Sequence, residues 1–235
     1  GTIQLLEQSR RTGVQRFVYA STGGALYGNV TAAAREDQPP APRSAYGLSK
    51  WTAEQYVRLY AREQLKSAVI LRYANVYGPR QDPHSETGVI AAFCSSLLQG
   101  HPAQIMGSPA IARDFIFVRD VIQATCLALV SPKLSTGLHC FNVGTGRPTT
   151  LDELLRRIAD QIQKIPGHQP SLPTPLYELI APRPGDLSSS VLDSSCLREQ
   201  LGWTATTELS SGLQETIHWY QSAGRQAFSP QAESR

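Results

Sequence analysis

Residues 16–20 (RFVYA) and 68–73 (AVILRY) are two short runs of β-forming and apolar residues, and a longer segment with helical spacing separates them. That segment, residues 44–64, starts at Ser44, a residue type that favours helix N-termini, and repeats its large apolar side chains near a period of 3.6. The run at 68–73 is almost continuously apolar, as are strands of a parallel sheet that is covered on both faces. Strand, helix and strand in this order predict an α/β fold.

The same alternation continues to about residue 220. The first twelve residues are typical of the end of a helix that stops at Gly13. Further helices are expected at about 88–99, 121–130, 151–163, 194–201 and 208–220, and further strands at 103–106, 115–118 and 138–143. Proline-rich loops are expected between 166 and 184, and a flexible polar tail at 221–235.

Composition narrows the class of protein. The 235 residues are 41% hydrophobic and 17% charged, and their apolar runs are too short to cross a bilayer. No signal peptide opens the chain, so we expect a cytoplasmic protein that does not bind membranes. The net charge of +3 comes from scattered Lys and Arg residues. Nucleic-acid binding needs a dense basic cluster, so we expect no nucleic-acid partner.

Cysteine and histidine spacing predicts no metal site. The four cysteines lie in or beside apolar stretches, so we expect buried free thiols at Cys94, Cys126, Cys140 and Cys196. No ligand spacing relates the five histidines, which are His84, His101, His139, His168 and His218.

Tyr46 and Lys50 form the pair with the clearest chemistry. Because they are four residues apart on a predicted helix, they share one face. A phenol has an ordinary pKa of about 10, which a neighbouring ammonium lowers, so such a pair can move a proton on and off a sugar hydroxyl. Ser21 and Thr22, which follow the first strand, are candidate hydroxyl donors. The same spacing also occurs in plain surface pairs, so it needs further support.

Six ordered motifs supply that support. They are RFVYASTGGALYG (16–28), SAYGLSKWTAEQY (44–56), LRYANVYGPRQDP (71–83), ARDFIFVRDV (112–121), FNVGTG (141–146), and RPGDLSSSVLD followed by LGW (183–193 and 201–203). In this order the sequence resembles the extended short-chain dehydrogenase/reductase family, and within it the NAD-dependent epimerases and dehydratases, closest to the UDP-glucose 4-epimerases. The resemblance covers about residues 1–220 and implies NAD as cofactor and a nucleotide sugar, most of all a UDP-sugar, as substrate.

The resemblance also implies roles for single residues. Tyr46 resembles the catalytic base and acid, and Lys50 the residue that lowers its pKa and binds the nicotinamide ribose. Positions that contact the cofactor are matched by Ala20, Ser21, Tyr46, Lys50, Tyr73 and Ala74. Positions that contact the sugar nucleotide are matched by Asn75, Gln104, Ile105, Met106, Arg113, Arg183 and Asp186. The alternatives are a plain salt bridge at Arg113 and a simple turn at 183–186.

Two features depart from the family pattern. In many epimerases the catalytic hydroxyl lies four residues before the Tyr-Gly of the first motif, where this chain has Gly23, so Thr22 is preferred to Ser21 as the donor. The family also binds the dinucleotide pyrophosphate at a Gly-x-x-Gly-x-x-Gly turn, and this sequence has none. We therefore expect the chain to be a fragment that lacks the first mononucleotide half, exposes a strand edge and dissolves poorly without a partner.

A fold and a domain division follow. We expect the C-terminal part of a Rossmann-type parallel sheet, with a smaller α/β substrate-binding domain. Residues 1–80, with 113–145 returning to them, are expected to form the second half of a dinucleotide-binding domain. Residues 81–112 and 146–220 are expected to form the substrate-binding domain. The resemblance implies a homodimer formed through the helix that bears Tyr46.

The leading prediction of activity is NAD-dependent epimerisation at C4 of a UDP-glucose or UDP-galactose type of sugar, through a 4-keto intermediate. The alternatives are a nucleotide-sugar dehydratase, a decarboxylase, or a chain that binds the nucleotide sugar without turnover. Dehydratases of the family carry an Asp-Glu pair where this chain has Gly23-Gly24, which argues against dehydration. A decarboxylase needs an arginine dedicated to the sugar carboxylate, and the sequence shows no candidate.

Overall fold

The computed structural model describes residues 1–85, 88–167 and 170–224, and these form two compact units. Unit 1 consists of Gly1–Val76, Ala112–Pro148 and Pro184–Thr206. Unit 2 consists of Tyr77–Ile111, Thr149–Arg183 and the described residues after Thr206. His168 and residues 225–235 of the expected tail lie outside the described residues.

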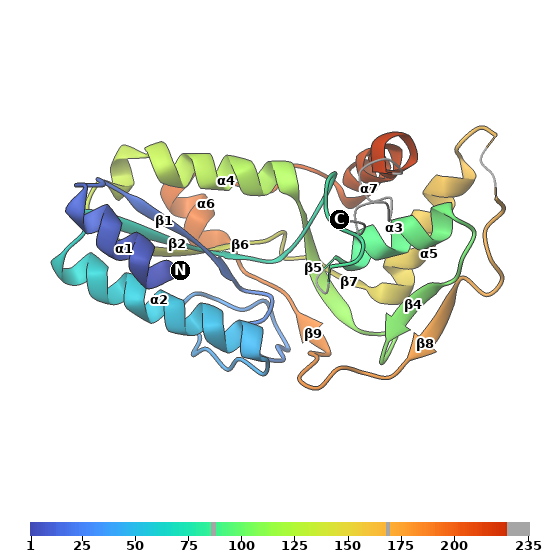
Figure 1. Cartoon of the computed structure of the whole chain (residues 1–235), viewed down its shortest axis with the longest axis horizontal. Coiled ribbons are helices and arrows are strands. Elements are labelled where there is room, and N and C mark those ends of the chain that lie inside the picture. The colour runs from blue at the N-terminus through green and yellow to red at the C-terminus, as the bar shows by residue number, and fades with distance from the viewer. Residues whose placement is uncertain (86–87, 168–169, 225–235) are drawn as a thin grey trace, which may run out of the picture. The chain divides into compact units, whose positions relative to one another are not determined.

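Unit 1 is built on a parallel sheet. Its strands β1 (Phe17–Thr22), β2 (Ser67–Tyr73) and β6 (Gly137–Val143) pair in the order β1-β2-β6. Helices cover both faces: α1 (Thr2–Arg11) and α2 (Ala45–Glu63) lie on one, and α4 (Val118–Val130) and α6 (Ser195–Leu201) on the other (Figure 1). The predicted α/β fold with a parallel sheet is confirmed.

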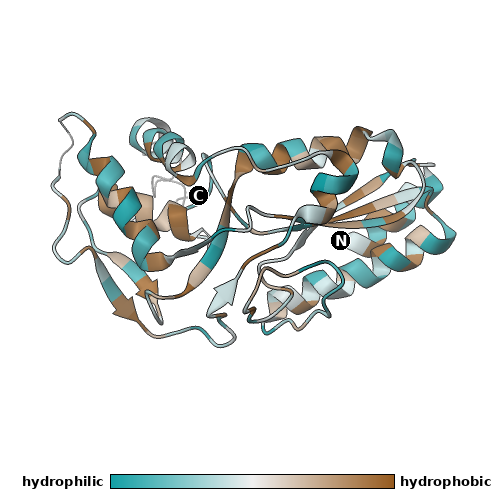
Figure 2. Cartoon of the chain, turned by 180° about the vertical axis from the view of Figure 1, so that it is seen from behind, coloured by the Kyte–Doolittle hydropathy of each residue, from teal (hydrophilic) through white to brown (hydrophobic). Residues whose placement is uncertain are grey.

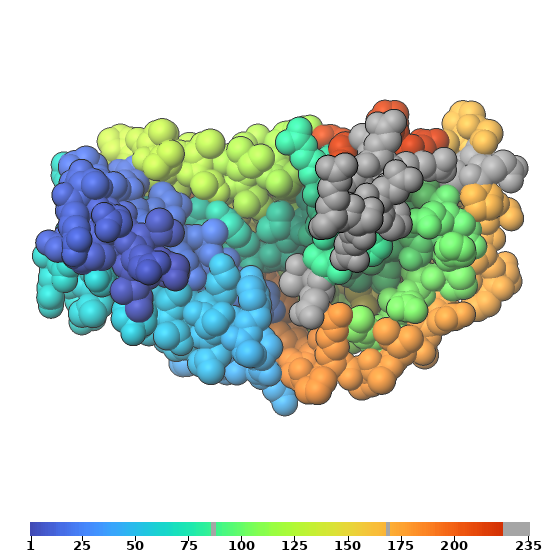
Figure 3. All heavy atoms as spheres, in the orientation of Figure 1, coloured from blue at the N-terminus to red at the C-terminus, as the bar shows by residue number. Residues whose placement is uncertain are grey.

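Strand β2 supplies side chains to both layers of unit 1. Val69 and Leu71 pack with apolar residues of α4 and α6, whereas Ala68 and Ile70 pack with those of α1 and α2. Because successive strand residues point to opposite faces, a near-continuous apolar run serves both layers. The three strands are mostly hydrophobic in Figure 2, and α1 and α2 lie side by side on the surface in Figure 3.

Shorter strands complete unit 1. Strand β5 (Ala112–Phe117) pairs with β3 (Asn75–Tyr77) and, in parallel, with β9 (Ser189–Ser190). A single 3-10 turn, η1 (Pro132–Leu134), leads from α4 toward β6.

Unit 2 consists of three helices and a small sheet. Helix α5 (Leu151–Gln163) contacts both α3 (Val89–Leu98) and α7 (Leu209–Trp219), and strands β4 (Ala103–Met106) and β8 (Tyr177–Ile180) pair in parallel. The short strand β7 (Pro148–Thr150) leads into α5, and the π-helical turn η2 (Tyr220–Gly224) follows α7. No helix among the residues that the structure describes has the length and apolar character needed to cross a membrane.

The structure changes several sequence expectations. Strand β1 continues to Thr22, because Ser21 and Thr22 pair with β2. Strands β3, β7, β8 and β9 had no sequence signal, since each is very short and depends on its pairing partner. Residues 184–206, expected in the substrate-binding domain, belong to unit 1, because β9 pairs with β5 and Leu192 is buried in the core of unit 1.

The expectation of four buried thiols was wrong for three of them. Cys94 is buried on α3, but Cys126 is exposed on α4 and Cys140 and Cys196 are only partly buried. All four are free. Cys126 lies on the outer face of its helix, where a short apolar run does not reveal which side faces the sheet.

Candidate active site

The start of α2 carries Tyr46. Ser44 caps the helix, and its Oγ accepts a hydrogen bond from the amide of Gly47 at 3.1 Å. Gly47 is packed against the turn after β1, since a Cβ at that position would lie 2.6 Å from the carbonyl oxygen of Ala25. The helix therefore begins directly beside the end of β1, and the Tyr46 side chain remains 49% exposed.

Lys50 connects α2 to β1. Its Nζ donates a hydrogen bond to the carbonyl oxygen of Ala20 at 3.0 Å, and it lies 5.9 Å from the centre of the Tyr46 ring. An ammonium carries three protons, so this bond leaves two for other acceptors, such as ribose hydroxyls. The structure thus brings Tyr46 and Lys50 together, as the four-residue spacing predicts.

Ser21 and Thr22, the two candidate hydroxyl donors, have different partners. The Oγ of Ser21 donates to Oε1 of Glu54 at 2.6 Å, and Ser21 is buried. The Oγ1 of Thr22 accepts a hydrogen bond from the amide of Ala25 at 3.3 Å, which uses a lone pair and not the proton. Ser21 is therefore committed to the protein interior, whereas Thr22 keeps a proton that it can donate.

A buried charged cluster lies behind Ser21. Arg72 is 1% exposed, and its Nη2 donates to Oε2 of Glu54 at 2.7 Å. Its Nη1 donates to the hydroxyl of Tyr27 at 2.7 Å, and this hydroxyl donates to Oδ1 of Asn142 at 2.8 Å. Burial lowers the pKa of Arg72, but the hydrogen bonds to Glu54 and the charges of Cys140, Tyr27 and Glu54 together raise it above its ordinary value. Burial raises the pKa of Tyr27 to about 12, so both groups keep their protons.

Sequence reasoning missed this cluster. The available signal was Arg72, a single arginine inside the apolar run of β2, because a buried charge is stable only with a buried partner. The four-residue step from Lys50 to Glu54 could have named that partner, because it continues the face that bears Tyr46.

The predicted residues after β2 lie beside the glycine turn. The side-chain amide of Asn75 donates a hydrogen bond to the backbone carbonyl oxygen of Asp114 at 3.3 Å. A Cβ at Gly24 would lie 3.5 Å from the Asn75 side chain. Ala74 is buried, and the hydroxyl of Tyr73 is hydrogen-bonded to Thr125 of α4 at 2.9 Å. The Tyr73 side chain therefore faces α4, the opposite face of the sheet from Lys50, and Thr22 pairs with Tyr73 as the last residue of β1.

Asp114 is a further buried residue of this region that the sequence did not single out. It accepts hydrogen bonds from the amide and the hydroxyl of Thr145, at 3.0 and 2.5 Å, and from the amides of Gly146 and Leu192, at 3.1 and 3.3 Å. Burial raises the pKa of Asp114, and the hydrogen bonds from Thr145 act against this. Asp114 thus holds the turn that ends β6.

Arg113 and Asp186 interact electrostatically within unit 1. Burial lowers the pKa of Arg113, and the charge of Asp186 acts in the opposite direction. Asp186 follows Gly185, whose φ of +85° and close approach to the carbonyl oxygen of Arg43 exclude other residues. The segment is thus a turn, as one alternative held, and it also carries Asp186 into the field of Arg113.

The remaining predicted substrate residues lie in unit 2. Arg183 precedes the return to unit 1, and Gln104, Ile105 and Met106 form most of β4. Ile105 is 1% exposed, so its side chain belongs to the interior of unit 2 and only its backbone remains for a ligand.

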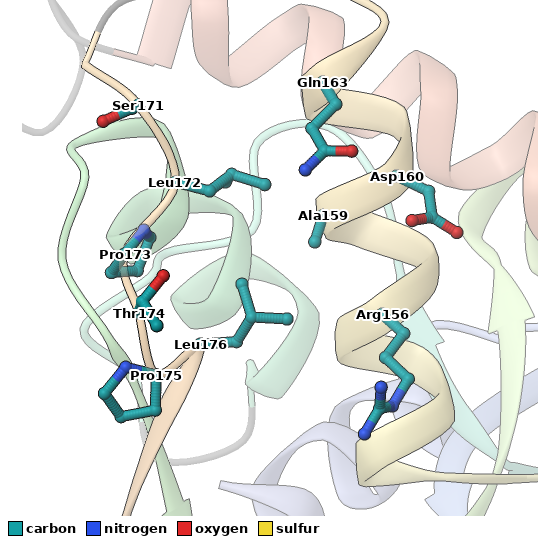
Figure 4. A pocket seen from close by; sticks show the side chains of 10 residues that line it. All are labelled: Arg156, Ala159, Asp160, Gln163, Ser171, Leu172, Pro173, Thr174, Pro175 and Leu176. Atoms are coloured by element: carbon teal, nitrogen blue, oxygen red, sulfur yellow. The ribbon is translucent and has the colours of Figure 1, made fainter.

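Two cavities are lined by none of the predicted site residues. In unit 2, a cavity of about 670 Å³ separates α5 from the loop Ser171–Leu176, with Arg156, Asp160 and Gln163 along the helix side (Figure 4). In unit 1, a cavity of about 220 Å³ is lined by the turn 144–146 and residues 192–194. Within the described ranges, no group of three or more His, Cys, Asp or Glu residues could hold a metal ion.

Comparison with known proteins assigns the fold and its site to a family. Residues 1–144 match the model of the NAD dependent epimerase/dehydratase family. The chain belongs to this family. The resemblance read from the six motifs is thereby confirmed, and the family's enzymes are NAD-dependent epimerases and dehydratases of nucleotide sugars.

Members with the same architecture include several epimerases. The chain is 38% identical to the UDP-glucose 4-epimerase of Mycolicibacterium smegmatis over 94% of its length and 67% of that protein. The solved UDP-glucose 4-epimerase of Thermus thermophilus in complex with NAD is 39% identical, with a TM-score of 0.82 over 94% of this chain and 69% of that one. The epimerase of Thermotoga maritima with UDP-glucose is 37% identical, with a TM-score of 0.80 over 94% and 68%. The chain therefore spans about two thirds of the length of these relatives.

The residues around Lys50 fit the nicotinamide end of NAD. Lys50 has two free ammonium protons for ribose hydroxyls, Tyr46 offers a phenol, and the neighbouring backbone carries small side chains at Ala20, Gly24 and Ala74. Because these residues are small, the nicotinamide ring can approach the backbone closely.

Proposed function

We propose that the chain carries the acid/base and substrate-contacting residues of an NAD-dependent epimerase that inverts C4 of a UDP-sugar of the glucose and galactose type. One observation supports this most directly: Tyr46 and Lys50 meet at the carboxyl end of β1, with Lys50 hydrogen-bonded to Ala20. Ligands of open α/β sheets bind at the carboxyl ends of the strands. The identities of 37–39% to UDP-glucose 4-epimerases favour this reaction within the family.

The proposed reaction has two proton transfers at one oxygen. Tyr46 accepts the proton of the C4 hydroxyl as the 4-keto sugar forms, and later returns it to the C4 oxygen on the inverted product. Thr22, the last residue of β1, is the proposed hydroxyl donor to the same sugar oxygen at the carboxyl end of the strand, and the ammonium of Lys50 binds ribose hydroxyls beside Tyr46. When bound, NAD supplies the hydride acceptor and donor for C4.

Arg113 and Asp186 are the proposed contacts to the nucleotide within unit 1. A guanidinium matches the oxygens of a diphosphate, and a carboxylate accepts hydrogen bonds from ribose hydroxyls. The roles of Arg183 and of Gln104–Met106 in unit 2 stay predictions, and so does a homodimer formed through α2. Leu59 is 48% exposed on that helix and is available to such a contact.

Gly23 argues against dehydration. Elimination of water needs further acid and base groups, and dehydratases of the family carry carboxylates at the positions of Gly23 and Gly24. A Cβ on Gly23 would lie 2.5 Å from Cδ1 of Leu192, so a side chain at that position would require Leu192 to move. The site as built favours epimerisation.

A chain that binds the nucleotide sugar without turnover is the second candidate, because the given sequence has no Gly-x-x-Gly-x-x-Gly turn of the kind that binds the dinucleotide pyrophosphate. One experiment separates the two: the chain is incubated with NAD and UDP-galactose, and UDP-glucose is measured by chromatography, while calorimetry records UDP-sugar and NAD binding. The epimerase proposal expects turnover that depends on NAD. UDP-sugar binding without any product would replace it with the binding function, and no binding of either ligand would contradict both.

A further inference from the structure

We propose that Glu54 is a positioning residue of this site, which ties Ser21 to α2 and thereby sets where Lys50 and Thr22 lie relative to Tyr46. The inference rests on the proposed function. It goes beyond the acid/base pair by assigning a task to the buried cluster of Ser21, Glu54 and Arg72, which proton transfer itself does not use.

Glu54 continues the reactive face of α2 into the protein. Tyr46, Lys50 and Glu54 follow one another at intervals of four residues, so they lie on one face of the helix. Tyr46 is half exposed, Lys50 partly buried and Glu54 fully buried at 0% exposure. The helix face that carries Tyr46 and Lys50 therefore continues to a fully buried carboxylate, that of Glu54.

The sheet register directs two further side chains to this carboxylate. Ser21 of β1 lies opposite Arg72 of β2, and paired residues of a parallel sheet point to the same face. The carboxylate of Glu54 accepts hydrogen bonds from both, at 2.6 Å from Oγ of Ser21 and 2.7 Å from Nη2 of Arg72. Arg58 adds a second guanidinium 3.8 Å from the carboxylate.

Ser21 stands between the two groups that the reaction needs. Its predecessor Ala20 provides the carbonyl that accepts the hydrogen bond of Lys50, and its successor Thr22 provides the candidate hydroxyl donor. The bond from Ser21 to Glu54 thus ties this tripeptide to the helix that bears Tyr46. Loss of the bond frees the end of β1 to shift against α2, and a small misplacement of reacting groups costs rate.

A purely structural ion pair would behave differently. It would lower the fraction of folded enzyme but leave the turnover of each folded molecule intact. The matched control is Ser67, which is also buried in a strand and donates to the carbonyl oxygen of Leu134 at 2.6 Å, at the opposite end of β2. Ser21→Ala and Ser67→Ala each remove one buried hydroxyl with a bond of the same length and leave every charge in place.

The first measurement compares kcat and KM of these two variants, per folded molecule. We expect Ser21→Ala to lower kcat about tenfold with KM for the UDP-sugar changed less than about twofold, and Ser67→Ala to change neither. Glu54→Gln keeps an acceptor for Ser21 but weakens the pairing with Arg72, so it should fall between Ser21→Ala and the parent. An unchanged kcat in Ser21→Ala would overturn the proposal.

The second measurement needs no turnover, so it remains decisive if the proposed function fails. Reductive methylation with formaldehyde is followed by mass spectrometry at Lys50, with Lys133 as the internal reference because its Nζ also donates to a carbonyl, that of Gln200, at 2.8 Å. We expect Lys50 to react at least about twofold faster in Ser21→Ala than in the parent, with Lys133 unchanged. If the labelling rate of Lys50 relative to Lys133 is the same in Ser21→Ala and in the parent, the proposal is contradicted. If this relative rate rises as expected but the parent chain forms no product from the UDP-sugar, only the epimerase function is contradicted.

Discussion

The side chain of Leu192 fills the space beside Gly23. A Cβ on Gly23 would lie 2.5 and 2.7 Å from the two methyl carbons of Leu192, which is itself 1% exposed and packed in the core of unit 1. A leucine far along the sequence thus crowds position 23, in the turn after β1, where the chain has glycine. This position lies beside the groups proposed to act on the sugar, so the lack of a side chain there bears on which reaction the site can carry out.

Gly23→Ala should therefore destabilise the protein. Overpacking a filled core site costs about 1–3 kcal/mol of the free energy of unfolding, which urea denaturation measures. The variant Leu192→Ala opens the space, so the double variant should lose less stability than the sum of the two single variants. Strict additivity would show that Leu192 does not restrict position 23.

Tyr46→Phe should remove the proposed base and leave binding intact. General acid/base groups contribute about 10²–10⁴-fold, so kcat for UDP-galactose should fall by at least about a hundredfold, while calorimetric binding of the UDP-sugar changes little. Tyr56→Phe is the control, since Tyr56 is 38% exposed on the same helix and outside the proposed site. Activity that survives Tyr46→Phe would exclude the proposed mechanism.

Thr22→Ala tests the choice of hydroxyl donor. The structure leaves the Thr22 proton available and commits that of Ser21 to Glu54. We expect kcat to fall by about tenfold or more in Thr22→Ala, consistent with the loss of one hydrogen bond to a developing charge, and Thr22→Ser to retain most of it. Equal rates for Thr22→Ala and the parent would assign the donor elsewhere.

Asp114→Asn should change how stability depends on pH. Burial raises the pKa of Asp114 in the folded protein above its ordinary value of 3.8, so the folded state binds this proton more tightly than the unfolded state. The contribution of Asp114 to stability is therefore present below pH 3.8 and is lost as the pH rises toward the raised pKa. The Asn variant should lack this slope in urea denaturation.

The same variant should also be less stable near neutral pH. Its amide nitrogen cannot accept the hydrogen bonds that Asp114 receives from Gly146 and Leu192, and an unsatisfied buried group costs about 1–3 kcal/mol. Parallel pH profiles for the two proteins would show that Asp114 does not titrate in the expected direction.

Sequence alone determined the features that depend on local periodicity. The apolar run at 68–73 and the helical spacing after Ser44 predicted the parallel sheet and α2, because burial on two faces and a period of 3.6 are properties of neighbouring residues. The four-residue step from Tyr46 to Lys50 predicted their meeting for the same reason. The six motifs, read in order, identified the family.

Only the tertiary structure decided the rest. Ser21 and Thr22 are adjacent and chemically alike, yet one is bound to Glu54, which lies 33 residues further along the chain, and the other is not. Leu192 crowds position 23, and residues 184–206 join unit 1 through a two-residue strand. These outcomes depend on sheet register and on contacts between distant residues. A register shift of one residue would turn Ser21 away from Glu54 without changing a letter of the sequence.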